Sequence, residues 1–294
     1  MADPQNPEVE PGATLVACVD FGSTFTKAAL VDVVTENAIW SQQYTRKQTD
    51  LVSLQSEIAR DISGSLRSRL SGADVAKVAK NHTANSEAYQ LYLKGRFQWN
   101  KRTAESLKSS VEFFNQAIAM DPNYALAYSG LAESYVLFPN YSVALPKESL
   151  PKAKASAIRA IELDDSLAEA HVALGIYLSV YSWNQLAAEK EFRRAIELNP
   201  NYPTAYQQLA NFCLNALGRV DEAVAVGRQA EELDPLSPVI SMDVGANLTR
   251  ARHFDEAIAQ LNRALALDPN FYATRYALGT AYHAKGQFDE AIAE

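Results

Sequence analysis

The chain has 294 residues, of which 48% are hydrophobic and 21% are charged, a composition that excludes a chain disordered throughout its length. No apolar run approaches the roughly 20 residues that a membrane-spanning helix needs, so the sequence predicts no membrane span. The formal net charge of −8 argues against general binding of nucleic acid. The two cysteines, Cys18 and Cys213, do not suggest a disulfide framework, which favours a reducing compartment such as the cytoplasm. A periplasmic location would require that the chain belong to a longer, membrane-anchored protein.

Positive charge is concentrated between residues 40 and 110, which hold 12 Lys and Arg against 6 Asp and Glu. This segment therefore has a net charge of +6, which leaves −14 for the remainder of the chain. The simpler interpretation is that these charges lie on solvated helix faces. The alternative is a basic patch that binds an acidic partner or a lipid.

The amino-terminal end of the chain predicts a tail followed by two strands. Residues 1–12 contain three prolines among polar residues and are expected to form a disordered tail. Two apolar stretches, Leu15–Val19 and Phe25–Val34, flank the turn residues Gly22-Ser23-Thr24. This pattern is typical of a β-hairpin.

The segment from Asp20 to Lys27 resembles the first phosphate loop of the actin-like ATPase superfamily, and most closely that of the MutL-type accessory proteins of glutamate mutase. The resemblance implies that Asp20 faces a hydrated Mg²⁺ and that Lys27 neutralises phosphate oxygens. The backbone amides of Gly22, Ser23 and Thr24 would complete this phosphate site. A nucleotide-binding, actin-like protein is therefore one alternative function, although the chain contains no Gly-Gly pair of the kind such ATPases use near the adenosine.

A second resemblance begins near residue 30 and is to the end of the TolB-like amino-terminal domain of bacterial signalling proteins. It implies two short strands, Leu30–Val33 and Ile39–Tyr44, joined at Thr35-Glu36-Asn37. They would pack an amphipathic helix that starts near Thr49. Apolar residues of this helix recur at spacings of three and four: Leu51, Leu54, Ile58, Ile62, Leu66 and Leu70.

These features predict a partial TolB-like α/β segment over residues 13–72. A polar connector is expected over residues 73–86. The rest of the chain, residues 87–294, is expected to form one repetitive helical domain.

The helical domain repeats two amphipathic helices with a period of 34 or 35 residues. A small residue of the second helix recurs as Ala160, Ala195, Ala230 and Ala264, and the proline that ends this helix recurs as Pro200, Pro235 and Pro269. A leucine or valine followed by a small residue recurs in the first helix: Leu131-Ala132, Leu174-Gly175, Leu209-Ala210, Val244-Gly245 and Leu278-Gly279. Small residues are needed where two helices cross closely. Period and landmarks together resemble the tetratricopeptide repeat.

The resemblance implies a mainly α fold, a right-handed solenoid of about five and a half repeats whose last repeat stops at Glu294. The step from Ala117 to Ala160 is 43 residues, so an insertion is expected between the two helices of the second repeat, over residues 138–151. An uncapped last repeat predicts either a longer protein, which is the preferred interpretation, or end-to-end self-association.

No motif in the repeats predicts catalysis, so the chain is not expected to be an enzyme. The four histidines show no metal spacing, and neither a nucleophile motif nor a glycine-rich nucleotide fingerprint occurs in the repeats. His171 occupies a bulky position of its repeat and is expected to be a packed side chain. We therefore predict no metal and no cofactor for the favoured function.

The tetratricopeptide resemblance implies a concave groove, lined by the first helices, that holds a peptide or helix of a partner protein. The predicted partner-binding residues are Glu133, Gln207, Gln208, Asn211, Met242, Tyr276 and Thr280, with Ser129, Val172, Ile176 and Ala246 as further groove positions. For Val172 and Ala246, packing between repeats is the preferred interpretation. Amides, a methionine and a tyrosine suit hydrogen bonds to a peptide backbone and an apolar anchor. The predicted function is a protein interaction scaffold, as a regulatory or sensory part of a bacterial signalling protein.

Overall fold

The computed structural model describes residues 15–21, 26–32, 38–44 and 83–294. The chain divides into two compact units, residues 1–91 with 119–122 and residues 92–118 with 123–294. The predicted tail, the Gly22-Ser23-Thr24 turn, the amphipathic helix from Thr49 and most of the predicted connector lie outside the described residues.

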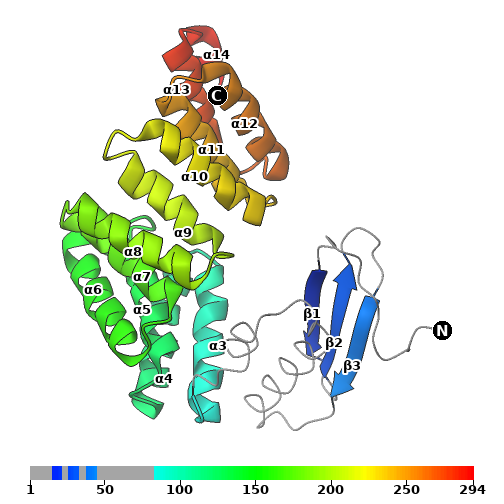
Figure 1. The fold of residues 1–294 in the computed structure, drawn as a ribbon, viewed down its shortest axis with the longest axis vertical. Coiled ribbons are helices and arrows are strands. Elements are labelled where there is room, and N and C mark those ends of the chain that lie inside the picture. The colour runs from blue at the N-terminus through cyan, green and yellow to red at the C-terminus, as the bar shows by residue number, and fades with distance from the viewer. Residues whose placement is uncertain (1–14, 22–25, 33–37, 45–82) are drawn as a thin grey trace. The chain divides into compact units, whose positions relative to one another are not determined.

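Three strands of the first unit form an antiparallel sheet: β1 (Leu15–Phe21), β2 (Thr26–Asp32) and β3 (Ala38–Tyr44), in that order (Figure 1). The predicted pairing of the first two apolar stretches is confirmed, because Leu15 lies opposite Asp32 and Phe21 opposite Thr26. Residues 30–32 of the strand predicted over Leu30–Val33 are the end of β2, and Val33 lies outside the described residues. β-branched and aromatic residues in all three segments favour this extended conformation.

Consecutive helix pairs make up the rest of the described chain (Figure 1). The first helices of the pairs are α3 (Ser86–Asn100), α5 (Ala125–Leu137), α7 (Ala168–Ile176), α9 (Pro203–Gln208), α11 (Pro238–Arg250) and α13 (Tyr272–Lys285). The second helices are α4 (Ala104–Met120), α6 (Pro146–Leu163), α8 (Gln185–Leu198), α10 (Val220–Leu233), α12 (Phe254–Leu267) and α14 (Phe288–Ala293). Two π-helical segments, η2 (Tyr177–Tyr181) and η3 (Leu209–Leu214), continue α7 and α9.

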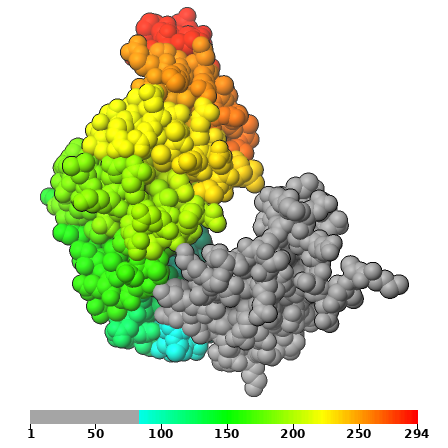
Figure 2. Space-filling model, viewed as in Figure 1, coloured from blue at the N-terminus to red at the C-terminus, as the bar shows by residue number. Residues whose placement is uncertain are grey.

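This arrangement confirms the predicted helical solenoid. In the space-filling view the colours of the helical unit follow one another in chain order, up to red at the carboxyl end (Figure 2). Such an order is expected where each repeat contacts mainly its neighbours.

Small residues let the two helices of a pair cross closely, as the sequence predicted. A Cβ atom built on Gly175 of α7 would lie 2.7 Å from the ring of Phe192 in α8. In the same way, a Cβ atom on Gly245 of α11 would lie 2.6 Å from Leu261 in α12. The recurring alanines of the second helix, among them Ala195, are fully buried. Larger residues at these positions would push the helix axes apart.

Three of the second helices end where the sequence places a proline. In α12 the residue after the helix is Asp268, which is extended and donates its backbone N–H to the carbonyl of Ala264. A proline at position 269 favours this conformation, because its ring clashes with a helical residue before it. Helices α8 and α10 end in the same way: Asn199 and Asp234 donate their backbone N–H groups to Ala195 and Ala230, and a proline follows each of them.

The insertion in the second repeat differs in part from the prediction. Only residues 138–145 form a loop, and α6 then begins at Pro146. Pro151, predicted to lie in the inserted loop, is inside α6, so this part of the prediction is wrong. Leu150 and Ala153 on either side of it are buried, and this packing outweighs the loss of one backbone hydrogen bond at the proline.

The turn inside each helix pair contains one residue with a left-handed backbone. These residues are Arg102 (φ 53°), Ser142 (φ 55°), Trp183 (φ 54°), Gly218 (φ 73°), Arg252 (φ 65°) and Gly286 (φ 87°). Glycine adopts this conformation without strain, whereas a Cβ atom in any other residue adds a steric penalty. Two of the six turns thus have the residue that the backbone favours.

Replacing Arg252 with glycine is expected to raise the free energy of unfolding by about 0.5–1 kcal/mol, because it relieves this strain. Urea denaturation of the full chain measures the effect. Ala251 precedes it with a right-handed backbone (φ −72°), so Ala251→Gly should lower stability by a similar amount. A loss of stability in Arg252→Gly would show that the turn is not strained.

Candidate functional site

The predicted partner-binding residues lie on four first helices and their π-helical continuations. Glu133 is on α5, Gln207 and Gln208 are on α9, and Asn211 is on η3. Met242 is on α11, and Tyr276 and Thr280 are on α13. Because η3 contacts α11 and α11 contacts α13, the residues from Gln207 to Thr280 come from neighbouring helices.

Polar side chains link α9 and η3 to α11. Gln207 Nε2 donates a hydrogen bond to Asp243 Oδ2 at 2.6 Å. Asn247 Nδ2 donates to Asn211 Oδ1 at 3.3 Å, and Asn215 Nδ2 donates to Asn247 Oδ1 at 2.8 Å. We call these five residues the amide ladder. Gln208 extends it through its Nε2, which lies 3.3 Å from Gln207 Oε1.

Asp243 is the charged member of the amide ladder. Burial raises the pKa of its carboxyl group, while hydrogen bonds from Gln207 and Asn211 and the charge of Arg250 act in the opposite direction. Its hydrogen-bond donors are thus neutral amides. Neither Asp243 nor the fully buried Asn247 was predicted as a site residue. The sequence signal that could have identified them is their position on the same first helix as Met242, a predicted groove residue.

A small hollow opens beside the amide ladder. It encloses about 150 Å³, open solvent included. Polar atoms come from Gln207, Asn211, Asp243 and Asn247, and apolar atoms from Ala210, Gly227, Ala230, Ile240 and Val244. Its interior has no room for a water molecule, so it is a shallow depression and not a pocket for a cofactor or small molecule.

The predicted groove residues differ widely in exposure. Gln207 is 9% exposed and Ser129 is 2% exposed, and Val172 and Ile176 are buried as well. The preferred interpretation of Val172 as a packing residue is thus consistent with the structure, and Ala246 is half-buried.

Five predicted residues present accessible atoms. Tyr276 is 80% exposed, Thr280 is exposed, and Gln208, Asn211 and Met242 are partly exposed. We call these five residues the accessible groove.

Glu133 lies apart from the accessible groove and has a partner within the chain. Its carboxylate pairs with Arg96 at 2.5 Å, and its side chain is 10% exposed. Burial raises the pKa of Glu133, and the Arg96 charge acts against this effect. Arg96 also lies over the ring of Trp99, 4.5 Å from its centroid. Glu133 therefore stabilises the contact between α3 and α5.

The residues considered for chemistry show no arrangement for catalysis in the described part of the chain. No group of three or more His, Cys, Asp or Glu side chains there could hold a metal ion. His171 is buried, with Nδ1 2.6 Å from Glu191 Oε2, as expected for a packed histidine. Burial raises the pKa of Cys213 to about 11, so its thiol is not a nucleophile at neutral pH.

The predicted phosphate loop lies only in part within the described residues. Asp20 of β1 lies opposite Lys27 of β2 in the strand register. Gly22, Ser23 and Thr24, which would supply its backbone amides, lie outside the described residues. Within the described ranges, no helix is both long enough and apolar enough to span a membrane.

Comparison with known families identifies two segments of the chain. Residues 191–225 and 248–294 match family models described as tetratricopeptide repeat. Most of helix α8 lies in the first of these segments, and α12 lies in the second.

Two curated relatives match about half of the chain. Transcriptional regulator HilA of Salmonella typhimurium is 27% identical over 149 residues, which are 51% of this chain and 27% of that protein. Putative adenylate cyclase 3 of Rhizobium meliloti is 29% identical over 153 residues, 52% of this chain and 26% of that protein. The match thus spans about a quarter of each relative's length.

Solved structures share the fold at low sequence identity. TTC0263, a thermophilic TPR protein of Thermus thermophilus, has a TM-score of 0.56 and 17% identity, covering 67% of this chain and 99% of that chain. A chain of the APC/C hetero-tetramer Cut9-Hcn1 has a TM-score of 0.54 and 18% identity, covering 84% of this chain and 50% of that chain.

Proposed function

Because this chain contains tetratricopeptide repeats, we propose that it is a non-catalytic scaffold that binds an extended segment of a partner protein along the accessible groove. The observation that carries the proposal is that partly exposed amide side chains are held in place by hydrogen bonds to buried polar side chains. Gln208 and Asn211 are partly exposed and sit on a hydrogen-bonded amide ladder. Side chains held in place by neighbours lose less entropy when they bind.

The chemistry of the accessible groove suits a peptide backbone with one apolar side chain. The amide N–H groups of Gln208 and Asn211 can donate to peptide carbonyls, whereas Oε1 of Gln208 is buried. Tyr276 presents a ring that is 80% exposed, and Met242 offers a flexible apolar surface on the neighbouring helix. Tyrosine is enriched among residues that dominate binding energy at protein interfaces.

We further propose that the scaffold is a regulatory part of a bacterial signalling protein. Two curated relatives support this role by their names, a transcriptional regulator and a putative adenylate cyclase. The chain matches only about a quarter of each, so the activities that these names denote are not assigned to this chain. In this proposal the amino-terminal segment is the end of a TolB-like domain.

A pull-down with the full chain tests the groove. Gln208→Ala/Asn211→Ala/Tyr276→Ala should lower capture of the partner about tenfold or more, because hot-spot residues each contribute about 2 kcal/mol or more. Phe288→Ala is the matched control, since this ring on α14 is 58% exposed and outside the accessible groove. Equal capture by the triple variant and the wild type would contradict the assignment.

Calorimetric titration with Mg-ATP distinguishes the actin-like alternative. The scaffold proposal expects no heat of binding. Binding that is lost in Asp20→Ala and in Lys27→Ala would instead establish the phosphate loop as the site.

A further inference from the structure

One edge of the solenoid gathers exposed and half-buried aromatic and basic side chains. Turns inside helix pairs lie along one edge of a solenoid, and connections between pairs lie along the other. We give the name basic-aromatic edge to these side chains in the first three inner turns and on the helix ends beside them. Its apolar members are Phe97, Trp99, Tyr135, Leu145, Tyr177, Tyr181, Trp183 and Leu186, and its basic members are Lys101, Arg102, Lys147, Lys152 and Lys154.

Four of the basic side chains of this edge each lie over an aromatic ring. The distances from cation to ring centroid are 4.5 Å for Lys101 and Phe97, 3.5 Å for Arg102 and Trp99, 5.7 Å for Lys152 and Tyr135, and 5.1 Å for Lys154 and Tyr177. The rings of Tyr177 and Tyr181 are 5.4 Å apart. Such cation–π pairs occur roughly once per 70–80 residues, so four in three turns is a concentration.

The first three inner turns differ in charge from four of the connections between pairs. The inner turns over residues 97–105, 135–154 and 177–186 hold five Lys and Arg against Glu105 and Glu148. The connections over residues 161–169, 196–204, 231–239 and 265–273 hold nine Asp and Glu and neither Lys nor Arg. In a chain of net charge −8, the first three inner turns therefore have a net charge of +3, and these four connections have a net charge of −9.

Contacts among the described residues do not account for four residues of this edge. Trp183 has a left-handed backbone, where two other repeats have glycine, and its side chain is 80% exposed. Leu186 and Leu145 are 69% and 55% exposed. Lys147 is the second residue of α6, where the helix dipole disfavours a cation. Within residues 83–294, the backbone strain at Trp183 and the exposed apolar area of Leu145 and Leu186 thus have no compensating contact.

We propose that the basic-aromatic edge docks on the surface of an anionic lipid bilayer. Trp183 and Leu186 enter the headgroup region, where tryptophan is favoured, while the lysines face acidic headgroups. Aliphatic and aromatic side chains at the tips of convex turns suit a fluid interface better than a nucleic acid, whose bases stack in grooves. Because the described helices are too short or too polar to span a membrane, the contact is a surface one. The accessible groove stays free for its partner.

Cosedimentation of the full chain with vesicles tests the charge contribution. The chain should bind phosphatidylcholine vesicles that contain about 30% phosphatidylglycerol, bind pure phosphatidylcholine weakly, and dissociate at high salt. Lys152→Gln/Lys154→Gln should lower the partition coefficient about tenfold or more, since each lysine near an anionic surface changes it about fivefold. Arg194→Gln/Arg228→Gln removes the same charge from α8 and α10 and should leave binding unchanged.

Tryptophan fluorescence tests insertion. Anionic vesicles should shift the emission of the wild type to shorter wavelength, and Trp183→Phe should remove most of the shift, because Trp99 is half-buried beneath Arg102. Trp183→Gly should fold, because glycine suits this turn, and should bind vesicles more weakly. Leu236→Ser, at a residue 77% exposed in a connection between pairs, should bind normally.

Three outcomes would overturn the proposal. The first is an absence of binding to the anionic vesicles. The second is equal partitioning of Lys152→Gln/Lys154→Gln and its control. The third is binding of a single-stranded oligonucleotide, lost in the lysine variant, without any binding of vesicles.

Discussion

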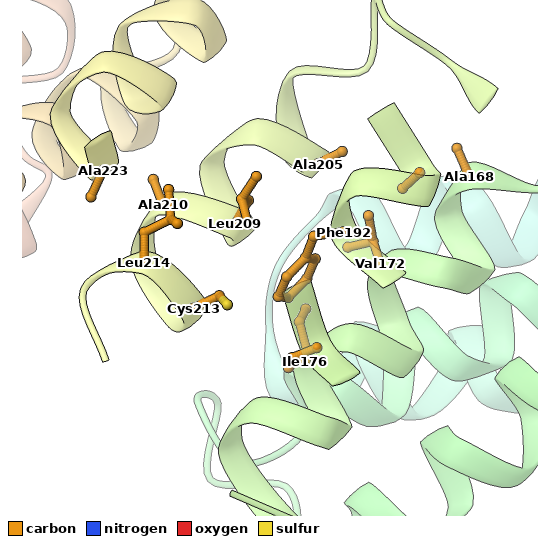
Figure 3. Close-up of a cluster of buried hydrophobic side chains, with 12 residues drawn as sticks. Ala168, Val172, Ile176, Phe192, Ala205, Leu209, Ala210, Cys213, Leu214 and Ala223 are labelled. Carbon is orange, nitrogen blue, oxygen red and sulfur yellow. The ribbon is translucent and has the colours of Figure 1, made fainter. Parts of the chain in front are cut away.

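Replacing Phe192 with alanine is expected to lower the free energy of unfolding by about 3–5 kcal/mol, the usual cost of truncating a buried aromatic ring. The side chain of Phe192 is fully buried, with an accessible fraction of 0%. Figure 3 shows its ring among Val172, Ile176 and Leu209, which come from α7 and the α9–η3 helix. Truncation would leave a cavity between two consecutive repeats, because Gly175 on the facing helix has no side chain to fill it.

Urea denaturation followed by circular dichroism measures this effect. Phe288→Ala is the matched control, and because its ring is 58% exposed and contacts only the ring of His283 among the described rings, it should lower stability by about 0.5–1.5 kcal/mol. Similar losses in both variants would mean that the contact between these repeats does not hold the solenoid together.

Replacing Arg96 with methionine is expected to lower stability by about 2–3 kcal/mol at pH 7, because the carboxylate of Glu133 loses its cation. The side chain of Glu133 is only 10% exposed. Removing one partner of a buried ion pair lowers the free energy of unfolding by about 3–5 kcal/mol. The expected loss is smaller here because Arg96 is partly exposed, so solvent screens the pair.

The loss should depend on pH in a defined direction. Burial already raises the pKa of Glu133 above its usual 4.5, and without Arg96 it should rise further. A carboxyl group whose pKa is higher in the folded state favours folding when protonated. The destabilisation relative to the wild type should therefore be full above the pKa of Glu133 in the folded variant, and it should vanish below the pKa of Glu133 in the folded wild type.

Denaturation of Arg96→Met at several pH values checks this prediction. Arg96→Met/Glu133→Leu is the control, and it should regain most of the stability because no buried charge remains. A loss that is independent of pH, or that persists in the double variant, would show that Arg96 acts through packing alone.

The helices could be predicted from the sequence because their signals are local. A buried position such as Ala195 recurs with the period of the repeat, and a proline such as Pro269 stops the second helix by its own geometry. Pro151 shows the limit of this reasoning. A proline within a helix is tolerated where neighbouring side chains are buried, and burial depends on residues far away in the sequence.

The candidate site was predicted less completely than the fold. Gln207 and Gln208 were both predicted to line the groove from their positions in the repeat. In the structure Gln207 is buried against Asp243, whereas Gln208 is partly exposed. The difference arises from how η3 and α11 pack, and the π-helical turn of η3 has no local sequence signal. Asn247 was missed for the same reason, since its partners lie on the preceding repeat.

Site-specific photocrosslinking from the accessible groove tests the central claim most directly. A photoreactive phenylalanine analogue is placed at Tyr276 in the full chain, and at Phe288 as the control, and cells are irradiated. We expect one crosslinked partner protein from position 276 that is absent from position 288 and is lost when Gln208→Ala/Asn211→Ala is added. An absence of crosslinks from position 276, or the same products from both positions, would contradict the account of this chain as a groove-binding scaffold.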